Sequence, residues 1–373
     1  MGNFLKIFYI APFATKFPST SASSIHMIRM CEALAFMGND VTLCIGNSEI
    51  VEEEILEFYG VLNRFKLVSV KGIVPKADRV IYSYRAASLA KCNGAELVIS
   101  RSSIPSLFSA KRFLPTVYDT HGPVWEKNFI EYQAYKLLRK SRYLKRVTTN
   151  SGKLKEMYEK ANLAPIFAPI IAAFNGATKH KVKNGEIPEL PGRAFLKVGY
   201  TGHLYEGRGI DVLLDVSKSL PDVDFHFFGG TPEDLKFWRS KIENAKNVFF
   251  HGFIQPGKLH VYREACDVLV APYQAGKVAV SGGKGDTSGY MNPIKVIEYL
   301  SSGKALVLSD LPAIREVVPE GVAFFVKFDD VDAWVDAIEK LKNNSLRTEL
   351  ANRASAIFSD SLTWTARARK LVE

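Results

Sequence analysis

The sequence has few of the features that mark a disulfide-rich or membrane-spanning chain. Its 373 residues include only four cysteines, and none of them lies in a CxxC spacing. This usage is typical of a reducing compartment and excludes a disulfide scaffold. No apolar run approaches the roughly 20 residues of a membrane-spanning helix. We also expect no secretory signal, because the first apolar run is short and strand-like and no small-residue cleavage site follows it.

Other classes are disfavoured by motifs that the chain does not contain. We find no internal repeat and no low-complexity tract, which argues against repeat and disordered architectures. After the first expected strand the chain has PSTSASS in place of GxGxxG, so a dinucleotide-dependent dehydrogenase is the least favoured enzyme class. No DxD-like acidic motif stands out, and we therefore expect no metal cofactor.

The composition is that of an ordinary globular protein with a basic surplus. Hydrophobic residues make up 47% of the chain, which is ample for buried cores. At about 100–200 residues per domain, the length predicts two domains. The formal net charge of +10 favours an anionic partner such as a nucleotide, a membrane surface or nucleic acid. Nucleic acid is the least favoured of these, because no recognition module is visible.

Strand and helix patterns alternate along both halves of the chain. Residues 5–13 predict a buried parallel strand, residues 25–38 a helix that ends at a glycine, and residues 39–46 a second strand. The same strand, loop and helix plan restarts near residue 195. We therefore expect an α/β protein of two Rossmann-like, doubly wound domains facing a central cleft.

The domain boundary is expected in the charged, Gly- and Pro-rich stretch 179–193. The prediction places an N-terminal acceptor-binding domain at 1–178, a linker at 179–196, a C-terminal nucleotide-sugar-binding domain at 197–355 and a final helix at 356–373. That final helix is expected to pack back towards the N-terminal domain. The functional terms in this division come from the family resemblance described below.

The segment 289–313 carries the clearest indication of a binding site. Apolar residues recur at helical spacing from Ile294 to Leu300, and Gly303 ends the pattern. A glycine-rich loop precedes this helix and would leave N–H groups beside the positive end of its dipole, which suits phosphate. Glu298, inside the helix, could accept hydrogen bonds from a vicinal diol such as ribose. A surface loop followed by an ordinary helix glutamate explains the same pattern equally well.

Two further positions lie at or beyond the ends of expected strands, where open parallel sheets bind ligands. His121 lies in the polar end of the strand expected at 116–122, although a lone histidine is more often structural. Ser21–Ser24 lie at the start of the first helix. They could contact a ligand there, or they could only cap the helix.

Residues 125–146 predict a long basic helix with interleaved tyrosines and leucines. Its residues Arg139, Lys140, Arg142 and Lys145 suit an anionic membrane surface, at roughly 1 kcal/mol for each basic residue near the lipid. A solvated face of a core helix is equally consistent with the pattern. We expect a cytoplasmic protein with peripheral contact to the inner face of the plasma membrane.

Taken in order, a series of short motifs resembles the retaining glycosyltransferases of family GT4, which have the GT-B fold. The motifs cover nearly the whole chain: PSTSASSIHMIRMCEALAFMGNDVTL, YDTHG, TNSGKLKEMYEK, APIIAAFNGA, YTGHLYEGRGIDVLL, FFGG, FFHGFI, CDVLVAPY and IKVIEYLSSGKALVLSDLPAIREVV. Each motif is weak alone, whereas their order and spacing together are specific. The resemblance implies transfer of a sugar from a UDP- or GDP-sugar to a glycan or lipid-linked acceptor in cell-surface polysaccharide, lipopolysaccharide or glycolipid synthesis.

The resemblance also implies roles for individual residues. Glu298 would hold the donor ribose hydroxyls, Arg208 would neutralise the donor diphosphate, and His121 would lie by the transferred sugar. His203 stands where the family usually has arginine, and Lys295 or Lys284 would compensate for that change. The remaining donor-binding positions would be Gly202, Gly252, Phe253, Ile254, Asn292, Pro293, Ile294 and Ser23.

One departure from the family concerns the sugar. Relatives carry another glutamate eight positions before the one that matches Glu298, and this chain has Tyr290 at that position.

Negative charge builds on the leaving phosphate as the bond between sugar and phosphate breaks, so fixed cations and N–H groups aimed at that phosphate lower the barrier. The family implies a metal-independent, hexosyltransferase-class reaction that retains anomeric configuration by a front-face mechanism.

Two other functions fit the same sequence. A sugar-nucleotide epimerase of the same architecture would convert its substrate with no acceptor present. A non-catalytic nucleotide-sugar-binding module is compatible with the absent glutamate and with His203 in place of arginine. Binding of nucleotide without transfer would favour the binding module.

Overall fold

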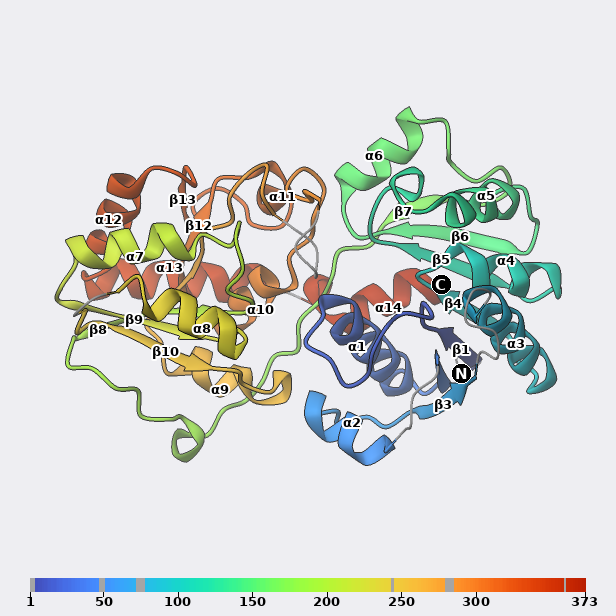
Figure 1. The fold of residues 1–373 in the computed structure, drawn as a ribbon, viewed down its shortest axis with the longest axis horizontal. Coiled ribbons are helices and arrows are strands. Elements are labelled where there is room, and N and C mark those ends of the chain that lie inside the picture. The colour runs from blue at the N-terminus through green and yellow to red at the C-terminus, as the bar shows by residue number, and fades with distance from the viewer. Residues whose placement is uncertain (1–3, 47–50, 72–77, 243–244, 279–284, 359) are drawn as a thin grey trace. The chain divides into compact units, whose positions relative to one another are not determined.

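The computed structural model describes residues 4–46, 51–71, 78–242, 245–278, 285–358 and 360–373. The chain forms two compact units, each with its own parallel sheet (Figure 1). Unit 1 comprises Met1–Asn175 and Trp364–Glu373, and unit 2 comprises Gly176–Thr363. The expected architecture of two Rossmann-like α/β domains is confirmed.

Unit 1 alternates strands and helices around a seven-stranded sheet of order β3-β2-β1-β4-β5-β6-β7. Its elements are β1 Lys6–Ile10, α1 Ala22–Phe36, β2 Asp40–Gly46, α2 Glu52–Tyr59, β3 Lys66–Val70, α3 Asp78–Cys92, β4 Leu97–Ser100, α4 Ser103–Lys111, β5 Thr116–Thr120, η1 Val124–Glu126, α5 Phe129–Leu138, β6 Leu144–Thr149, α6 Gly152–Lys160, β7 Ile170–Ala172 and α14 Trp364–Val372. All neighbouring strands pair in parallel. Their carboxyl ends therefore meet at one edge of the sheet.

Unit 2 has a six-stranded parallel sheet of order β10-β9-β8-β11-β12-β13. Its elements are η2 Asn184–Glu186, β8 Leu196–Thr201, α7 Ile210–Ser219, β9 Val223–Phe228, α8 Pro232–Arg239, β10 Val248–Gly252, η3 Pro256–Lys258, α9 Leu259–Glu264, β11 Val268–Ala271, α10 Ile294–Ser302, β12 Ala305–Ser309, α11 Pro312–Arg315, β13 Phe324–Val326, α12 Val331–Lys340, α13 Asn344–Ile357 and η4 Asp360–Leu362. The last strand, β13, lies at one edge of this sheet.

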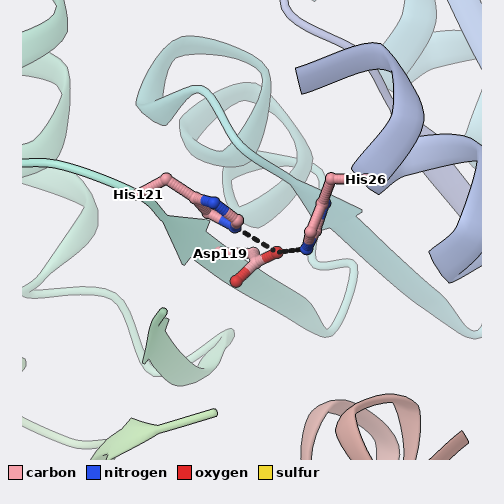
Figure 2. Close-up of side chains that lie close together, drawn as sticks. All are labelled: His26, Asp119 and His121. Carbon is pink, nitrogen blue, oxygen red and sulfur yellow. Dashed lines mark hydrogen bonds and ion pairs between the residues drawn. The ribbon is translucent and has the colours of Figure 1, made fainter. Parts of the chain in front are cut away.

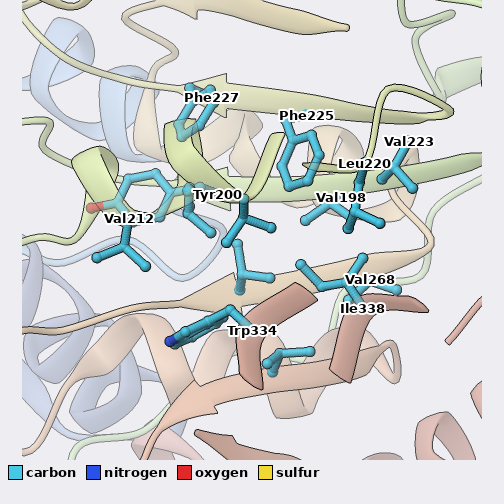
Figure 3. Packing of buried hydrophobic residues seen from close by; sticks show 14 of the residues in the cluster. Val198, Tyr200, Val212, Leu220, Val223, Phe225, Phe227, Val268, Trp334 and Ile338 are labelled. Atoms are coloured by element: carbon cyan, nitrogen blue, oxygen red, sulfur yellow. The ribbon is translucent and has the colours of Figure 1, made fainter. Parts of the chain in front are cut away.

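The core of unit 2 follows from the alternation of side chains along β9. Phe225 and Phe227 point to one face, where they belong to a buried cluster that includes Trp334 of α12 (Figure 3). His226, between them, contacts Phe249 of the neighbouring strand β10 instead. Helices cover both faces of such a sheet, so its strands are apolar throughout rather than alternating with polar residues. This packing holds the strand ends, and the turns that follow them, in fixed positions.

The prediction of one long basic helix at 125–146 is wrong. A 3-10 turn covers Val124–Glu126, α5 ends at Leu138 with Arg139 as its C-cap, and the chain turns so that β6 begins at Leu144. The physical reason is tertiary, because residues from Leu144 onward pair with β5 and complete the sheet. The charge and tyrosine pattern fits a helix locally but carries no information about that pairing.

The two units divide near the predicted linker. Unit 2 begins at Gly176, shortly before the stretch 179–196, and the linker role of that stretch stays a prediction. The final helix α14 begins at Trp364, later than the predicted 356, and belongs to unit 1, where it contacts α1 (Figure 1). None of the helices in the described ranges combines the length and apolarity needed to cross a bilayer.

Candidate functional site

Two cations meet over one tyrosine ring at the carboxyl edge of the unit 2 sheet. Arg208 follows β8, Tyr273 follows β11 and Lys295 lies in the first turn of α10. The guanidinium carbon of Arg208 lies 5.2 Å from the centroid of the Tyr273 ring, and Lys295 Nζ lies 5.1 Å from it. Lys295 Nζ also lies 3.7 Å from the centroid of the Tyr200 ring. The sheet therefore holds two like charges close together against aromatic faces.

The electrostatics of Lys295 are unfavourable in the protein alone. Burial lowers the pKa of Lys295 well below its ordinary value, and the nearby charge of Arg208 lowers it further. Its place in the first turn of α10 adds repulsion from the positive end of the helix dipole. No carboxylate of the described residues makes a salt bridge with it. An anion bound beside Lys295 and Arg208 would relieve all of these costs together.

The amino end of α10 is itself open to an anion. Pro293 is the N-cap residue, and no side chain among the described residues caps the helix. The first N–H groups of an uncapped helix point at whatever lies before it, which suits a phosphate group. Asn292 and Pro293 are buried and Ile294 is partly buried, so they fix the position of this helix end.

Glycines allow the strand-end turns to pack against one another beside the two cations. Gly202 has φ +131°, and a Cβ atom there would lie 3.1 Å from Lys295 Nζ. Gly229, which follows β9, has φ +132°, and a Cβ atom there would lie 2.1 Å from the Gly202 carbonyl oxygen. The Gly229 N–H donates to the carbonyl oxygen of Gly252 at the end of β10. Larger residues would push these turns away from the lysine.

Glu298 lies one helical turn beyond Lys295 on α10, and a buried arginine holds its carboxylate. Arg263 NH1 of α9 lies 3.3 Å from Glu298 Oε2. The Arg263 side chain is only 4% exposed, whereas that of Glu298 is 30% exposed. The buried guanidinium thus fixes one carboxylate oxygen while the group stays accessible to a ligand.

If Glu298 binds the nucleotide sugar that the family resemblance implies, Arg263→Met should weaken that binding about tenfold and change kcat little. Arg263 acts through Glu298, so its loss frees the carboxylate without removing a group that contacts the reacting atoms. A charge-assisted hydrogen bond of about 1.5 kcal/mol corresponds to that factor. Steady-state kinetics measures KM and kcat separately. Arg353→Met, on the exposed face of α13, is the control; a fall in kcat with unchanged KM would refute the positioning role.

The other donor-binding residues predicted in unit 2 lie at the same edge wherever the structure describes them. The rings of His203 and Tyr205 stack with 5.3 Å between their centroids. The backbone carbonyl oxygen of His203 accepts a hydrogen bond from the Tyr200 hydroxyl. Phe253 is half exposed and Ile254 partly buried in the turn after β10. Lys284, with part of the glycine-rich loop, lies outside the described residues.

A second cluster lies at the carboxyl edge of the unit 1 sheet, around the buried carboxylate of Asp119 (Figure 2). His121 Nε2 lies 3.3 Å from Asp119 Oδ2, and His26 Nε2 of α1 lies 3.6 Å from the same oxygen. Arg367 of α14 is fully buried and lies 2.5 Å from the other oxygen, Oδ1. The Thr148 hydroxyl donates to Oδ1 as well, over 2.7 Å.

This cluster keeps His121 neutral. Burial, followed by the charge of Arg101, lowers the pKa of His121 to about 3. Burial and the neighbouring His121 also lower the pKa of His26 well below its ordinary value. At neutral pH the partly buried His121 therefore offers a hydrogen-bonding imidazole rather than a proton that can be donated as an acid.

His26, Asp119 and His121 bring three potential metal ligands within 4.8 Å of one another. Arg367 already places a positive charge beside these three side chains. It forms an ion pair with Asp119, and its NH2 group lies 3.2 Å from His121 Nε2. A divalent cation would be repelled by that guanidinium. We therefore interpret the cluster as a support for His121, and metal independence stays a prediction.

Ser23 lies in the first turn of α1 at this edge. The guanidinium of Arg101, which follows β4, lies 2.9 Å from Ser23 Oγ and 3.1 Å from its carbonyl oxygen. Ser21 caps α1 by accepting from the Ser24 N–H, and the Ser24 hydroxyl bonds back to Ser19 and Ser21. These serines thus organise the helix start, while a ligand contact at Ser23 stays a prediction.

Several residues of both clusters were not singled out from the sequence. Arg367 lies in the stretch WTARARK, whose regularly spaced basic residues resemble an exposed helix face. Arg263 precedes the buried strand β11 and lies in none of the motifs, whereas Tyr273 ends the motif CDVLVAPY but was given no role. Only the order of strands in each sheet brings them to the site.

Comparison with known proteins was made for sequence and for structure. Residues 196–344, which lie within unit 2, match the model of the family described as Glycosyl transferases group 1. TuaH, the glycosyltransferase proposed for teichuronic acid biosynthesis in Bacillus subtilis, is 23% identical over 154 residues. That match covers 41% of this chain and 36% of TuaH, so the matched part spans about a third of the relative.

Solved structures match over almost the whole chain. Sucrose-phosphate synthase from Thermosynechococcus elongatus has a TM-score of 0.71 at 14% identity and covers 98% of this chain and 97% of its own. HepE of Anabaena, in complex with UDP and glucose, has a TM-score of 0.72 at 14% identity, with 99% and 98% covered. A TarM variant of S. aureus has a TM-score of 0.72 at 10% identity, with 99% of both chains covered. The architecture is therefore GT-B.

Proposed function

We propose that the protein is a glycosyltransferase that moves a sugar from a nucleotide-diphosphate sugar to a glycan or lipid-linked acceptor. The observation that carries the proposal is the pair of cations Arg208 and Lys295 around Tyr273, with Glu298 one turn further along α10. The family match over 196–344 spans all these residues. A diphosphate fits the cations and the helix end, and a ribose diol fits the carboxylate.

The proposed chemistry uses the two cations at the leaving group. When the bond between the sugar and the diphosphate breaks, negative charge grows on the phosphate and positive charge on the sugar ring. Arg208, Lys295 and the first N–H groups of α10 are held ready for that negative charge, which makes such stabilisation effective. We propose a metal-independent, retaining reaction of the hexosyltransferase class, in which the leaving phosphate helps to take the acceptor proton.

The donor and the pathway are proposed from the relatives. HepE is described with UDP and glucose, and the TarM variant with UDP, alpha-GlcNAc-glycerol and Fondaparinux. TuaH is named for teichuronic acid biosynthesis. These names support UDP-sugars as the first donors to test, GDP-sugars as the second, and a cell-surface polysaccharide or glycolipid as the acceptor.

A sugar-nucleotide epimerase remains the second candidate because it shares the architecture. A structure described as a UDP-N-acetylglucosamine 2-epimerase from Listeria monocytogenes has a TM-score of 0.58 at 12% identity. The fold therefore does not separate the two activities, and the match to Glycosyl transferases group 1 favours transfer.

A thermal-shift panel of UDP-, GDP- and ADP-sugars tests the proposal. A ligand that binds only the native state at a hundred times its Kd stabilises it by about 2.7 kcal/mol, so the true donor should raise Tm by several degrees. Glu298→Ala should abolish that rise. Chromatography of the best donor, with and without candidate acceptors, then separates transfer from epimerisation. If no nucleotide sugar raises Tm, or if Glu298→Ala responds like wild type, the proposal is wrong.

Peripheral contact with an anionic membrane is also proposed. From the sequence, membrane contact was expected through one amphipathic helix carrying Arg139, Lys140, Arg142 and Lys145. That helix is not present, because α5 ends at Leu138 and β6 begins at Leu144. Lys140, Arg142 and Lys145 are exposed and Arg139 is partly buried, so support has to come from the surface they form.

A further inference from the structure

Large apolar side chains project from three neighbouring turns of unit 1. They come from residues 111–115, 136–145 and 162–169, which precede or lead into β5, β6 and β7. Their exposed fractions lie between 38% and 66%. The five residues are Phe113, Leu137, Tyr143, Ile166 and Phe167. Single exposed apolar residues need no explanation, whereas a contiguous set marks an interaction surface.

Contacts between the three turns show that these side chains form one surface. The rings of Phe113 and Tyr143 lie 5.3 Å apart between centroids. The guanidinium of Arg142 lies 5.3 Å from the centroid of the Phe167 ring. The Ile166 N–H donates to the carbonyl oxygen of Arg139, over 2.9 Å. We call residues 111–115, 136–145 and 162–169 together the amino-edge patch.

The charge of the amino-edge patch has one sign. Its three segments contain no aspartate or glutamate. They contain seven basic residues, of which all but the partly buried Arg112 and Arg139 are exposed: Lys111, Arg112, Lys136, Arg139, Lys140, Arg142 and Lys145. Each basic residue close to an anionic lipid surface strengthens binding about fivefold.

Two backbone positions in the patch are unusual. Phe113 has φ +63° and Asn162 has φ +54°, and in the described part of the chain no other residue except glycine has a positive φ. A bulky aromatic residue in this left-handed region is an outlier, whereas asparagine adopts it readily. Phe113 is also 66% exposed, so burial in the core does not explain its retention there. Strain of this kind concentrates at functional surfaces.

The patch lies at the edge of the sheet opposite to the ligand edge. Phe113 lies three residues before β5 begins, and His121 follows directly after β5 ends. Five residues of extended strand separate these two edges by roughly 17 Å. A partner bound at the patch therefore leaves the carboxyl edge of unit 1 uncovered.

We propose that the amino-edge patch docks unit 1 on an anionic lipid bilayer, with Phe113 and Phe167 entering the interface and the carboxyl edge facing away from it. The patch is built of aromatic and aliphatic side chains interleaved with lysine and arginine, which is the composition that binds the boundary between headgroups and acyl chains. The apolar residues project from turn tips, where a yielding lipid surface accommodates them. This inference is independent of the transferase proposal, because vesicle binding requires neither donor nor acceptor.

Sedimentation of the full chain with vesicles tests the proposal. The protein should pellet with vesicles of phosphatidylcholine and phosphatidylglycerol, and weakly with phosphatidylcholine alone. The variant Lys140→Ser/Arg142→Ser should lower the anionic-vesicle partition coefficient roughly tenfold or more. Lys153→Ser/Lys155→Ser on α6 is the matched control, because it removes the same charge from unit 1 at partly exposed positions outside the patch. The control should keep most of the binding.

Phe113→Asn separates docking from folding. Asparagine suits the left-handed backbone, so this variant should keep or raise the Tm of the protein while it loses vesicle binding. Equal loss in the Lys153→Ser/Lys155→Ser control would overturn the proposal, since net charge alone would then explain binding. It would equally be overturned by full binding of Phe113→Asn, by equal binding to neutral vesicles, or by no binding to anionic ones.

Discussion

Replacing Arg367 by methionine is expected to lower the free energy of unfolding by about 3–5 kcal/mol, because it leaves a buried carboxylate uncompensated. Arg367 and Asp119 are both fully buried and lie 2.5 Å apart. The Thr148 hydroxyl still donates to Asp119 in the variant, but a neutral hydroxyl does not balance the charge. Denaturant titration measures the loss as a lower midpoint with an unchanged slope.

Two variants control for the loss of a long basic side chain. Arg369→Met changes an exposed arginine on the same helix and should alter stability by less than about 0.5 kcal/mol. Adding Asp119→Asn to Arg367→Met should restore part of the loss, because the buried charge is then gone. If Arg367→Met is as stable as wild type, the ion pair does not support the cluster around His121.

The pH dependence of the Arg367→Met effect has a defined sign. In the wild type, burial alone would raise the pKa of Asp119, but the charge of Arg367, together with the hydrogen bond between His121 and the carboxylate, holds it well below its usual range. That lowered pKa adds stability above the unfolded pKa of about 3.9 and loses it as the pH falls further. Without Arg367, burial raises the pKa and the charged form destabilises the fold. The difference between wild type and variant should therefore begin to shrink as the pH falls below the raised pKa of Asp119 in the variant, and it should go on shrinking towards the lowered pKa of the wild type.

Lys295→Met is expected to lower kcat by roughly 10²–10³-fold, as the loss of one preorganised group at a developing anion does. The same substitution should raise the free energy of unfolding by about 0.5–2 kcal/mol, because active-site residues often lower the stability of the folded protein. The lysine is partly buried beside Arg208 and at a helix amino end, and methionine removes that repulsion. Product formation and denaturant unfolding measure the two effects separately.

A fall in kcat together with a rise in the free energy of unfolding would distinguish a ligand-binding role of Lys295 from a structural one. Because burial and Arg208 lower the folded pKa of Lys295, the repulsive charge is lost as the pH rises through that pKa. The stability advantage of the variant should therefore narrow towards pH 10. Lys218→Met, at an exposed position near the end of α7, should change neither quantity. Loss of both activity and stability would mean that Lys295 supports the fold rather than the ligand.

The fold was predictable where local pattern and burial agree. Buried parallel strands have continuous apolar runs, so the strands expected at 5–13 and 116–122 were recognisable, as was the restart near 195. The stretch 125–146 was not, because its later residues form β6 only by pairing with β5. The strand β3 and its flanking helices α2 and α3 were not assigned from the sequence, and their residues are less regularly patterned.

The candidate site was predictable in part for the same reason. Glu298 and Lys295 share one helix with a clear period, so their spacing alone places them on neighbouring turns. Arg367 and Asp119 are 248 positions apart, and no local pattern relates them. The contribution of Tyr273 depends on β11 lying beside β8 in the sheet, which is a property of the topology. Sequence thus identified the groups with a motif, and the structure added those that position them.

Calorimetric titration of UDP into the wild type, Lys295→Met and Lys218→Met tests whether Lys295 binds the donor diphosphate. We predict saturable binding to the wild type and to Lys218→Met, and at least tenfold weaker binding to Lys295→Met, since a charge-assisted contact is worth about 1.5–3 kcal/mol. GDP and ADP titrated in the same way identify the base. Undiminished UDP binding by Lys295→Met, or no binding of any of the three nucleotides to the wild type, would contradict this prediction.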